Sequence, residues 1–186
     1  QLPLPGEHNI LNALSAAGVG LHLGMTLEEV AQGLNKVKIS AMRLAKVAGI
    51  NNTIIINDAY NANPTSTKAS LQVLAKTEGG RKIAVLGDMR ELGTIEEECH
   101  FQAGEFTAEL GIDHLVAVGK LGKFMAEGAL AAGMTKDHVR FFDSNEGAKV
   151  YLRNLLKPYD VILVKGSRAV KMEEIVNFVA QPEGKK

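Results

Sequence analysis

The sequence predicts an α/β protein whose core is a doubly wound, mostly parallel Rossmann-like sheet, preceded by two helices. Short runs of β-branched and aliphatic residues alternate with longer stretches of helical periodicity, and this alternation is typical of βαβ units. The runs are almost continuously apolar, as expected for strands that are buried on both faces. Several runs end abruptly in polar residues, and open sheets of this class bind their ligands at the carboxyl ends of the strands.

Two helical segments come first in the chain. Residues 7–19 place Ile10 and Leu14 on one face of a helix. Thr26, with Glu29 three residues later, forms a capping-box pattern that opens a second helix. No strand separates these helices, so they are expected to belong to a different unit from the sheet.

The rest of the chain alternates between expected strands and helices, with one hairpin-like turn at residues 49–52. The expected strands span residues 43–48, 53–57, 82–86, 114–118, 139–142 and 160–164. The expected helices begin at Pro64 with Asn63 as N-cap, span residues 95–110 and 121–132, follow an Asp143 or Ser144 cap to residue 156, and span residues 171–179.

The composition argues against several classes of function. With 21 basic and 21 acidic residues the formal net charge is zero, so no nucleic-acid partner is expected. The single cysteine, Cys99, excludes an internal disulfide and indicates a reducing compartment, and the histidines show no metal-site spacing. No run is long enough for a membrane span and none resembles a signal peptide, so no membrane partner is expected. The chain begins with Gln1 rather than Met, which suggests a piece of a longer protein.

Polar side chains follow three of the expected strands at the point where each strand ends. They are Asp58, Tyr60, Asn61 and Asn63 after the second strand, Asp88, Arg90 and Glu91 after the third, and Lys165, Ser167 and Arg168 after the last. Because the carboxyl ends of parallel strands share one edge of a sheet, we expect these side chains to lie along a single rim.

Each cluster allows a functional and a structural interpretation. Lys165, Ser167 and Arg168 surround a glycine and could bind an anion, or could form a βα turn with two solvated charges. Asp88 and Glu91 could hold an ammonium group or a metal ion, or could reflect the preference for acidic residues near a helix N-terminus.

Two further patterns are weaker. Asn9 and Asn12 lie three residues apart in the first helix, where they could cap or be solvated, or could read the edge of a purine. The segment at residues 119–122, Gly-Lys-Leu-Gly, lacks the third glycine of a dinucleotide-binding motif, so a packing turn is expected there.

Four segments resemble motifs of the Mur ligase family. Residues 6–17 resemble the G-x-H-N-x-x-N-x-x-A-A signature, and residues 58–64 resemble the D-x-Y-N-A-N-P element of the members that add D-alanyl-D-alanine. Residues 86–93 and 164–168 match further motifs of those members. The four segments occur in the family's order and span essentially the whole chain.

The resemblance implies a place in a three-domain, ATP-dependent ligase. Residues 1–40 would be the last helices of the central ATP-binding domain, and residues 41–186 would form the C-terminal domain. The sequence contains no G-x-x-x-x-G-K-[ST] P-loop, so ATP and Mg²⁺ would be held mainly by the missing part of the central domain. The expected function is that of a cytoplasmic enzyme of peptidoglycan precursor synthesis, whose substrates are UDP-N-acetylmuramoyl-tripeptide and D-alanyl-D-alanine. The chain would be inactive without the N-terminal and central domains, and would not itself supply a metal site.

The resemblance also implies roles for individual residues. Adenine contacts would come from His8, Asn9 and Asn12, ribose or phosphate contacts from Arg43 and Asp58, and further cofactor-cleft contacts from Tyr60, Asn61 and Asn63. The catalytic residues would be Asp88, Lys165 and Arg168, with Glu91 and Ser167 near the dipeptide substrate. Two positions depart from the family pattern: Met42 stands where a glycine commonly precedes the arginine, and Asn57 stands where an acidic residue is common.

Two other classes of protein share this predicted fold. A receiver-type signalling module would use Asp88 as phosphoacceptor and Lys165 at the end of the last strand, but it has no place for two leading helices. A nicotinamide-dependent enzyme would need a G-x-G-x-x-G motif, which the sequence does not contain.

Overall fold

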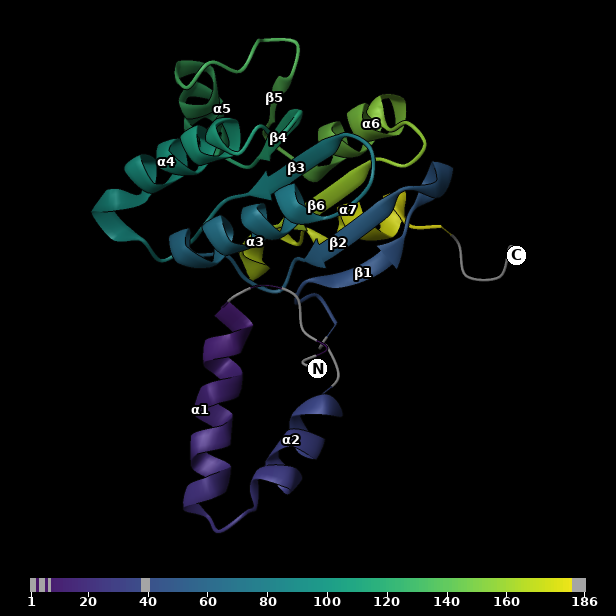
Figure 1. Ribbon diagram of the computed structural model, residues 1–186. Coiled ribbons are helices and arrows are strands. Elements are labelled where there is room, and N and C mark those ends of the chain that lie inside the picture. The colour runs from purple at the N-terminus through teal and green to yellow at the C-terminus, as the bar shows by residue number, and fades with distance from the viewer. Residues whose placement is uncertain (1–2, 4–5, 7, 38–40, 182–186) are drawn as a thin grey trace. The chain divides into compact units, whose positions relative to one another are not determined.

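The computed structural model describes residues 3, 6, 8–37 and 41–181, with only the backbone described at residue 8. The chain divides into two compact units, residues 1–40 and 41–186, and each is described by itself (Figure 1). The division coincides with the expected change from two helices to an α/β sheet. The assignment of the first unit to a central ATP-binding domain stays a prediction.

The first unit contains two helices, α1 (His8–His22) and α2 (Leu27–Asn35). The helix α1 runs beyond the expected end at residue 19 and stops before Gly24, whose φ of 90° is the left-handed conformation that ends many helices. The predicted capping box of α2 is confirmed, because the Thr26 hydroxyl accepts from the Glu29 N–H at 3.2 Å and the Thr26 N–H donates to Glu29 Oε2 at 2.8 Å.

The second unit alternates between strands and helices. Its elements, in chain order, are β1 (Ala45–Ala48), η1 (Ile50–Asn52), β2 (Ile54–Asp58), α3 (Pro64–Lys76), β3 (Lys82–Gly87), η2 (Gly93–Ile95), α4 (Glu96–Glu109), β4 (His114–Val118), α5 (Gly122–Ala131), β5 (Val139–Phe142), α6 (Asn145–Leu155), β6 (Val161–Lys165), η3 (Arg168–Val170) and α7 (Glu173–Val179).

The strands form one six-stranded sheet in the order β1-β2-β6-β3-β4-β5. The edge strand β1 is antiparallel to β2, and all other neighbours are parallel. The register places Lys165 at the end of β6 opposite Asp58 of β2 on one side and Leu86 of β3 on the other. The predicted mostly parallel sheet is therefore confirmed.

Helices cover both faces of the sheet, which makes it doubly wound (Figure 1). Alternate residues of each central strand enter different cores: on β6, Val161 and Leu163 pack with α3, α4 and α5, whereas Ile162 and Val164 pack with α6 and α7. This alternation follows from the two-residue period of a strand. It explains why the strand sequences are apolar throughout.

Two element boundaries differ from those expected for a backbone reason, and one expected N-cap lacks its hydrogen bond. The strand β1 begins at residue 45 rather than 43, because Met42 and Leu44 have φ values of 62° and 55°, which are incompatible with a strand. The helix expected over residues 171–179 is α7, which begins two residues later than expected because Lys171 adopts a left-handed φ of 54° between η3 and α7. Ser144, one of the two expected caps, occupies the N-cap position of α6, but its side chain makes no capping hydrogen bond.

Glycines allow α4 and α5 to approach closely. A Cβ atom added at Gly104 of α4 would overlap the carbonyl oxygen of Met125, and one added at Gly128 of α5 would overlap the carbonyl oxygen of Phe101. Both obstacles are backbone atoms, which cannot move aside as a flexible side chain can.

Within the described residues, no helix has the length and apolar character needed to cross a membrane.

Candidate functional site

The carboxyl ends of β2, β6 and β3 lie next to one another, and their loops are hydrogen-bonded together. The Ser167 N–H donates to the Asp88 carbonyl at 3.0 Å, and the Ser167 hydroxyl donates to the Ala62 carbonyl at 3.4 Å. Ser167 thus joins the loops that follow all three strands. The predicted convergence of the polar clusters on one rim of the sheet is confirmed for Asp58, Asp88 and Lys165.

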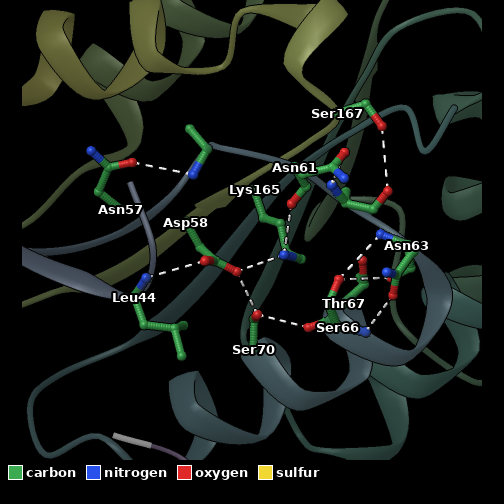
Figure 2. A network of polar contacts seen from close by, with 12 residues as sticks. Leu44, Asn57, Asp58, Asn61, Asn63, Ser66, Thr67, Ser70, Lys165 and Ser167 are labelled. Carbon is green, nitrogen blue, oxygen red and sulfur yellow. Dashed lines mark hydrogen bonds and ion pairs between the residues drawn. The ribbon is translucent and has the colours of Figure 1, made fainter. Parts of the chain in front are cut away.

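A buried ion pair lies at the centre of this rim (Figure 2). The Nζ of Lys165 is 2.6 Å from Asp58 Oδ2 and 2.9 Å from the carbonyl oxygen of Asn61, to which it also donates. Asp58 Oδ2 further accepts from the Ser70 hydroxyl at 2.7 Å, and Oδ1 accepts from the Leu44 N–H at 3.1 Å. The pair therefore ties together β2, β6, α3 and the residue that precedes β1.

Burial sets the electrostatics of this pair. The Lys165 side chain is only 3% exposed, and its burial lowers the pKa of its ammonium group below the ordinary value. The Asp58 carboxylate opposes that shift in the pKa, and the positive charge of Arg43 adds to it. Lys165 is held mainly by its contacts with protein groups and is not exposed as a ligand-binding cation.

The first turn of α3 is fixed by its N-cap. Asn63 Oδ1 accepts from the Ser66 N–H at 2.8 Å, and the Asn63 N–H donates to the Ser66 hydroxyl at 3.1 Å, with Pro64 in the first turn (Figure 2). The predicted N-cap is confirmed. Asn61 and Asn63 are both exposed at the start of this helix, beside the buried ion pair.

Arg43 and Tyr60 form an exposed stacked pair. The Arg43 guanidinium carbon lies 4.4 Å from the centre of the Tyr60 ring, and the Tyr60 N–H donates to the Met42 carbonyl at 3.2 Å. Met42 adopts a left-handed φ of 62°, a conformation that glycine tolerates more easily than other residues. This backbone conformation gives a physical reason for the glycine that the family resemblance leads us to expect at this position.

Arg168 is the exposed cation of the last loop. Its side chain is 59% exposed and its Nη1 is 2.8 Å from Glu173 Oε1. The backbone beside it is tightly packed, because a Cβ atom added at Gly166 would lie 2.5 Å from Met172 Cγ and 3.1 Å from the Cα of Gly87. The glycines therefore let the ends of β3 and β6 approach each other.

Asp88 and Glu91 lie on one loop but have different environments. Asp88 is 4% exposed, and its Oδ1 accepts from the Leu121 N–H at 3.0 Å. A Cβ atom at Gly119 would overlap the Asp88 carboxylate, so the turn expected at residues 119–122 packs against this side chain. Glu91 is exposed, has a left-handed φ of 65°, and makes no hydrogen bond or ion pair with the described residues.

Two buried histidines predict a pH dependence of stability. His100 is fully buried in α4, and His114 begins β4 with its Nε2 3.2 Å from Arg81 Nη1. Burial lowers the pKa of both imidazoles, and the Arg81 charge adds to the effect at His114. The unfolded chain therefore binds protons more readily than the folded protein below about pH 6.5.

We expect the contribution of these two histidines to the free energy of unfolding to be constant above about pH 6.5. Below that pH the free energy of unfolding should fall as the pH decreases, by at most about 1.4 kcal/mol per pH unit for each histidine. Urea unfolding at pH 7.5, 6.5 and 5.5 measures the slope. The His100→Gln variant should show a shallower slope than the wild type, and an equal slope in the two proteins would contradict the assignment.

The remaining candidates belong to the first unit. Asn12 Nδ2 donates to Asn9 Oδ1 at 3.1 Å, so the two amides are adjacent on α1 as the spacing predicts. The side chain of His8 lies outside what the structure describes. The contacts proposed between these three residues and adenine stay predictions. Within the described ranges, no group of three or more histidine, cysteine, aspartate or glutamate side chains could hold a metal ion.

Sequence reasoning missed two residues of this rim. Ser70 supports Asp58 from α3, and His100 accepts the Met89 N–H at 2.9 Å from α4. A signal for His100 was present, since His100, Ala103, Gly104 and Thr107 follow the i, i+3, i+4, i+7 pattern of one buried helix face. A histidine on such a face needs partners for its polar atoms.

Comparison with known proteins identifies the family. A family model described as "Mur ligase, glutamate ligase domain" matches residues 42–168. The UDP-N-acetylmuramoyl-tripeptide–D-alanyl-D-alanine ligase of Bacillus subtilis (strain 168) is 42% identical over 176 residues, which are 94% of this chain and 38% of the relative. The enzyme of the same name from Escherichia coli (strain K12) is 40% identical over 182 residues, which are 97% of this chain and 38% of that relative.

Solved structures agree. The crystal structure of MurF from Acinetobacter baumannii matches with a TM-score of 0.83 and 37% identity over 95% of this chain and 38% of that one. The MurF ligase of Thermotoga maritima in complex with ADP matches with a TM-score of 0.77 and 25% identity over 94% of this chain and 38% of that one. The chain thus spans well under half the length of these relatives. Its fold, its motifs and these matches together place it in the Mur ligase family.

Proposed function

We propose that this chain supplies the C-terminal part of an ATP-dependent ligase that joins D-alanyl-D-alanine to UDP-N-acetylmuramoyl-tripeptide in peptidoglycan precursor synthesis. The observation that carries the proposal is the match, over nearly the whole chain, to relatives that bear this activity in their names. The meeting of the three strand-end loops supports it, because the same motifs that suggest the family supply those loops. No relative described above is a receiver-type module, and the buried Asp88 carboxylate gives that alternative no further support.

The proposed chemistry has two steps. ATP phosphorylates the carboxylate of the nucleotide-linked peptide, and the amine of the dipeptide then attacks the acyl phosphate through a tetrahedral intermediate, releasing phosphate. Neither step needs a covalent bond to the enzyme, so the protein contributes positioning and electrostatic stabilisation. ATP and Mg²⁺ would be held mainly by the central domain, which carries the P-loop motif that this sequence does not contain. A cytoplasmic location is part of this proposal, since the reaction uses ATP.

The residues of the rim fall into two groups: buried residues that position their neighbours, and exposed residues that can contact a ligand. The buried Lys165, Ser167 and Asp88 hydrogen-bond mainly to other protein groups, so we assign them to positioning rather than to contact with the reacting atoms. Arg168 is exposed and restrained by Glu173, so it is the cation that can reach the transferring phosphoryl group.

The exposed residues around the ion pair would bind the nucleotide. The Arg43 guanidinium, stacked on Tyr60, would offset phosphate charge, and the exposed amides of Asn61 and Asn63 would line the same cleft. Asp58 Oδ1 accepts only one described hydrogen bond, so it can accept a second from a ribose hydroxyl. His8, Asn9 and Asn12 would contact the adenine.

The function is tested with the intact ligase that contains this sequence and, separately, with the 186-residue chain. We expect the intact enzyme to form the amide and release phosphate with ATP, UDP-N-acetylmuramoyl-tripeptide and D-alanyl-D-alanine, as followed by mass spectrometry and phosphate release. The chain alone should form no product. Equal or faster reaction with D-glutamate, L-alanine or L-lysine as the amine, or no amide with any of them, would overturn the proposal.

A further inference from the structure

The loop that follows β3 is held from several sides while its tip remains exposed. Met89 is fully buried, and the Thr67 hydroxyl of α3 contacts its sulfur at 3.5 Å. Arg90 and Glu91, the next two residues, are exposed, and their side chains make no hydrogen bond or ion pair within the described residues. The start of the loop is therefore held in place by buried contacts, and its exposed tip carries two unpaired charges of opposite sign.

His100 holds the backbone amide of Met89 at the start of this loop. Its Nε2 lies 2.9 Å from the Met89 nitrogen, and its Nδ1 lies 2.6 Å from the Glu96 carbonyl oxygen. A backbone N–H can only donate, so Nε2 must accept, and Nδ1 must carry the proton and donate to Glu96. Both ring nitrogens are thereby used, in the neutral form of the imidazole and in one tautomer.

Ser167 fixes the next amide, that of Arg90. The Arg90 N–H donates to the Ser167 hydroxyl oxygen at 2.9 Å. Two consecutive peptide groups are thus held by side chains from α4 and from the loop after β6. The residue that follows them is Glu91, whose left-handed φ of 65° strains a non-glycine residue and persists only where the surroundings impose it.

We propose that His100 is a positioning residue for Glu91, whose carboxylate receives the amino group of the dipeptide substrate. This rests on the proposed function. An amine that arrives as an ammonium ion is attracted by a carboxylate and repelled by a guanidinium, which selects Glu91 over Arg90 on the same loop. His100 touches no substrate in this proposal and acts through the Met89 amide.

Steady-state kinetics of the intact ligase test the role of Glu91. Glu91→Gln should raise the KM for D-alanyl-D-alanine by about 10- to 100-fold, as expected for loss of a hydrogen bond to a charged group, with the KM for ATP unchanged. Arg90→Gln removes the neighbouring charge and should leave both KM values unchanged. An unchanged dipeptide KM in Glu91→Gln, or an equal rise in Arg90→Gln, would overturn the proposal.

The role of His100 is tested by comparing two replacements. His100→Leu removes the acceptor and should raise the dipeptide KM as Glu91→Gln does, whereas His100→Gln can place an amide oxygen near the position of Nε2 and should remain close to the wild type. A general loss of packing would instead raise every KM or lower stability alone. His100→Gln behaving like His100→Leu in the dipeptide KM would overturn the positioning role.

A measurement on the 186-residue chain separates this inference from the proposed function. Hydrogen–deuterium exchange of residues 88–92 should accelerate in His100→Leu and stay slow in His100→Gln and in Gln102→Ala, an exposed control on the same helix. Fast exchange in the wild type would overturn the positioning role. If exchange behaves as expected but the intact wild-type enzyme does not use D-alanyl-D-alanine, then the proposed function fails and the loop anchor stands.

Discussion

Replacement of Lys165 by methionine is expected to lower the free energy of unfolding by about 3–5 kcal/mol, because breaking a buried ion pair leaves a buried charge without its partner. The charge left behind is the Asp58 carboxylate, whose side chain is 11% exposed. The carbonyl oxygen of Asn61 loses its lysine donor in the same variant. Urea unfolding followed by circular dichroism at pH 7.5 measures the loss.

Lys149→Met is the matched control for this prediction. Lys149 Nζ is also 2.6 Å from a carboxylate oxygen, that of Glu146, and it is 3.5 Å from Glu174 Oε2, but these two carboxylate side chains are 79% and 43% exposed. Exposed pairs contribute about 0–1 kcal/mol, so the control should be nearly as stable as the wild type. Adding Asp58→Asn to Lys165→Met should cost less than the two single losses together, because the pair is removed as a unit. A Lys165→Met loss no larger than the control's would mean that the pair does not hold the rim together.

The fold was predictable because its signals are local. Continuous apolar runs such as Val161–Val164 predict strands buried on both faces, and alternation with helices predicts a parallel sheet. Errors fell at the element ends, where single residues such as Met42 and Lys171 adopt left-handed backbone conformations. Non-glycine side chains carry little sequence signal for that conformation, so the late starts of β1 and of α7 could not be anticipated.

The rim was predictable as a place, but the partners within it were not. Strand ends are readable in the sequence, and parallel strands bring their carboxyl ends to one edge. Which side chain then bonds to which depends on the strand order. Only the insertion of β6 between β2 and β3 places Lys165 beside Asp58, 107 residues away. Lys165 and Asp58 were each interpreted from the sequence as contacts to a ligand. In the structure they form an ion pair with each other.

Gly104→Ala is expected to destabilise the sheet unit by about 3 kcal/mol, at the upper end of the usual cost of overpacking. The added methyl group would overlap the Met125 carbonyl oxygen and would also lie 2.8 Å from the Ala129 nitrogen, so α4 and α5 would have to separate. Alanine normally favours a helix interior over glycine by roughly 0.5–1 kcal/mol, so the predicted sign is opposite to the intrinsic preference. Thermal and urea unfolding of the variant measure the loss.

Gly18→Ala provides the control with the same chemical change. Gly18 lies inside α1, and a Cβ atom added there meets nothing within 4 Å, so this variant should be no less stable than the wild type. Gly128→Ala should behave like Gly104→Ala, because its added carbon meets the Phe101 carbonyl from the other side of the same contact. Equal stability of Gly104→Ala and wild type would show that α4 and α5 do not need this close approach.

His100 is on α4, so separation of the two helices should also loosen the loop that carries Glu91. Faster hydrogen–deuterium exchange at residues 88–92 in Gly104→Ala would reveal this loosening.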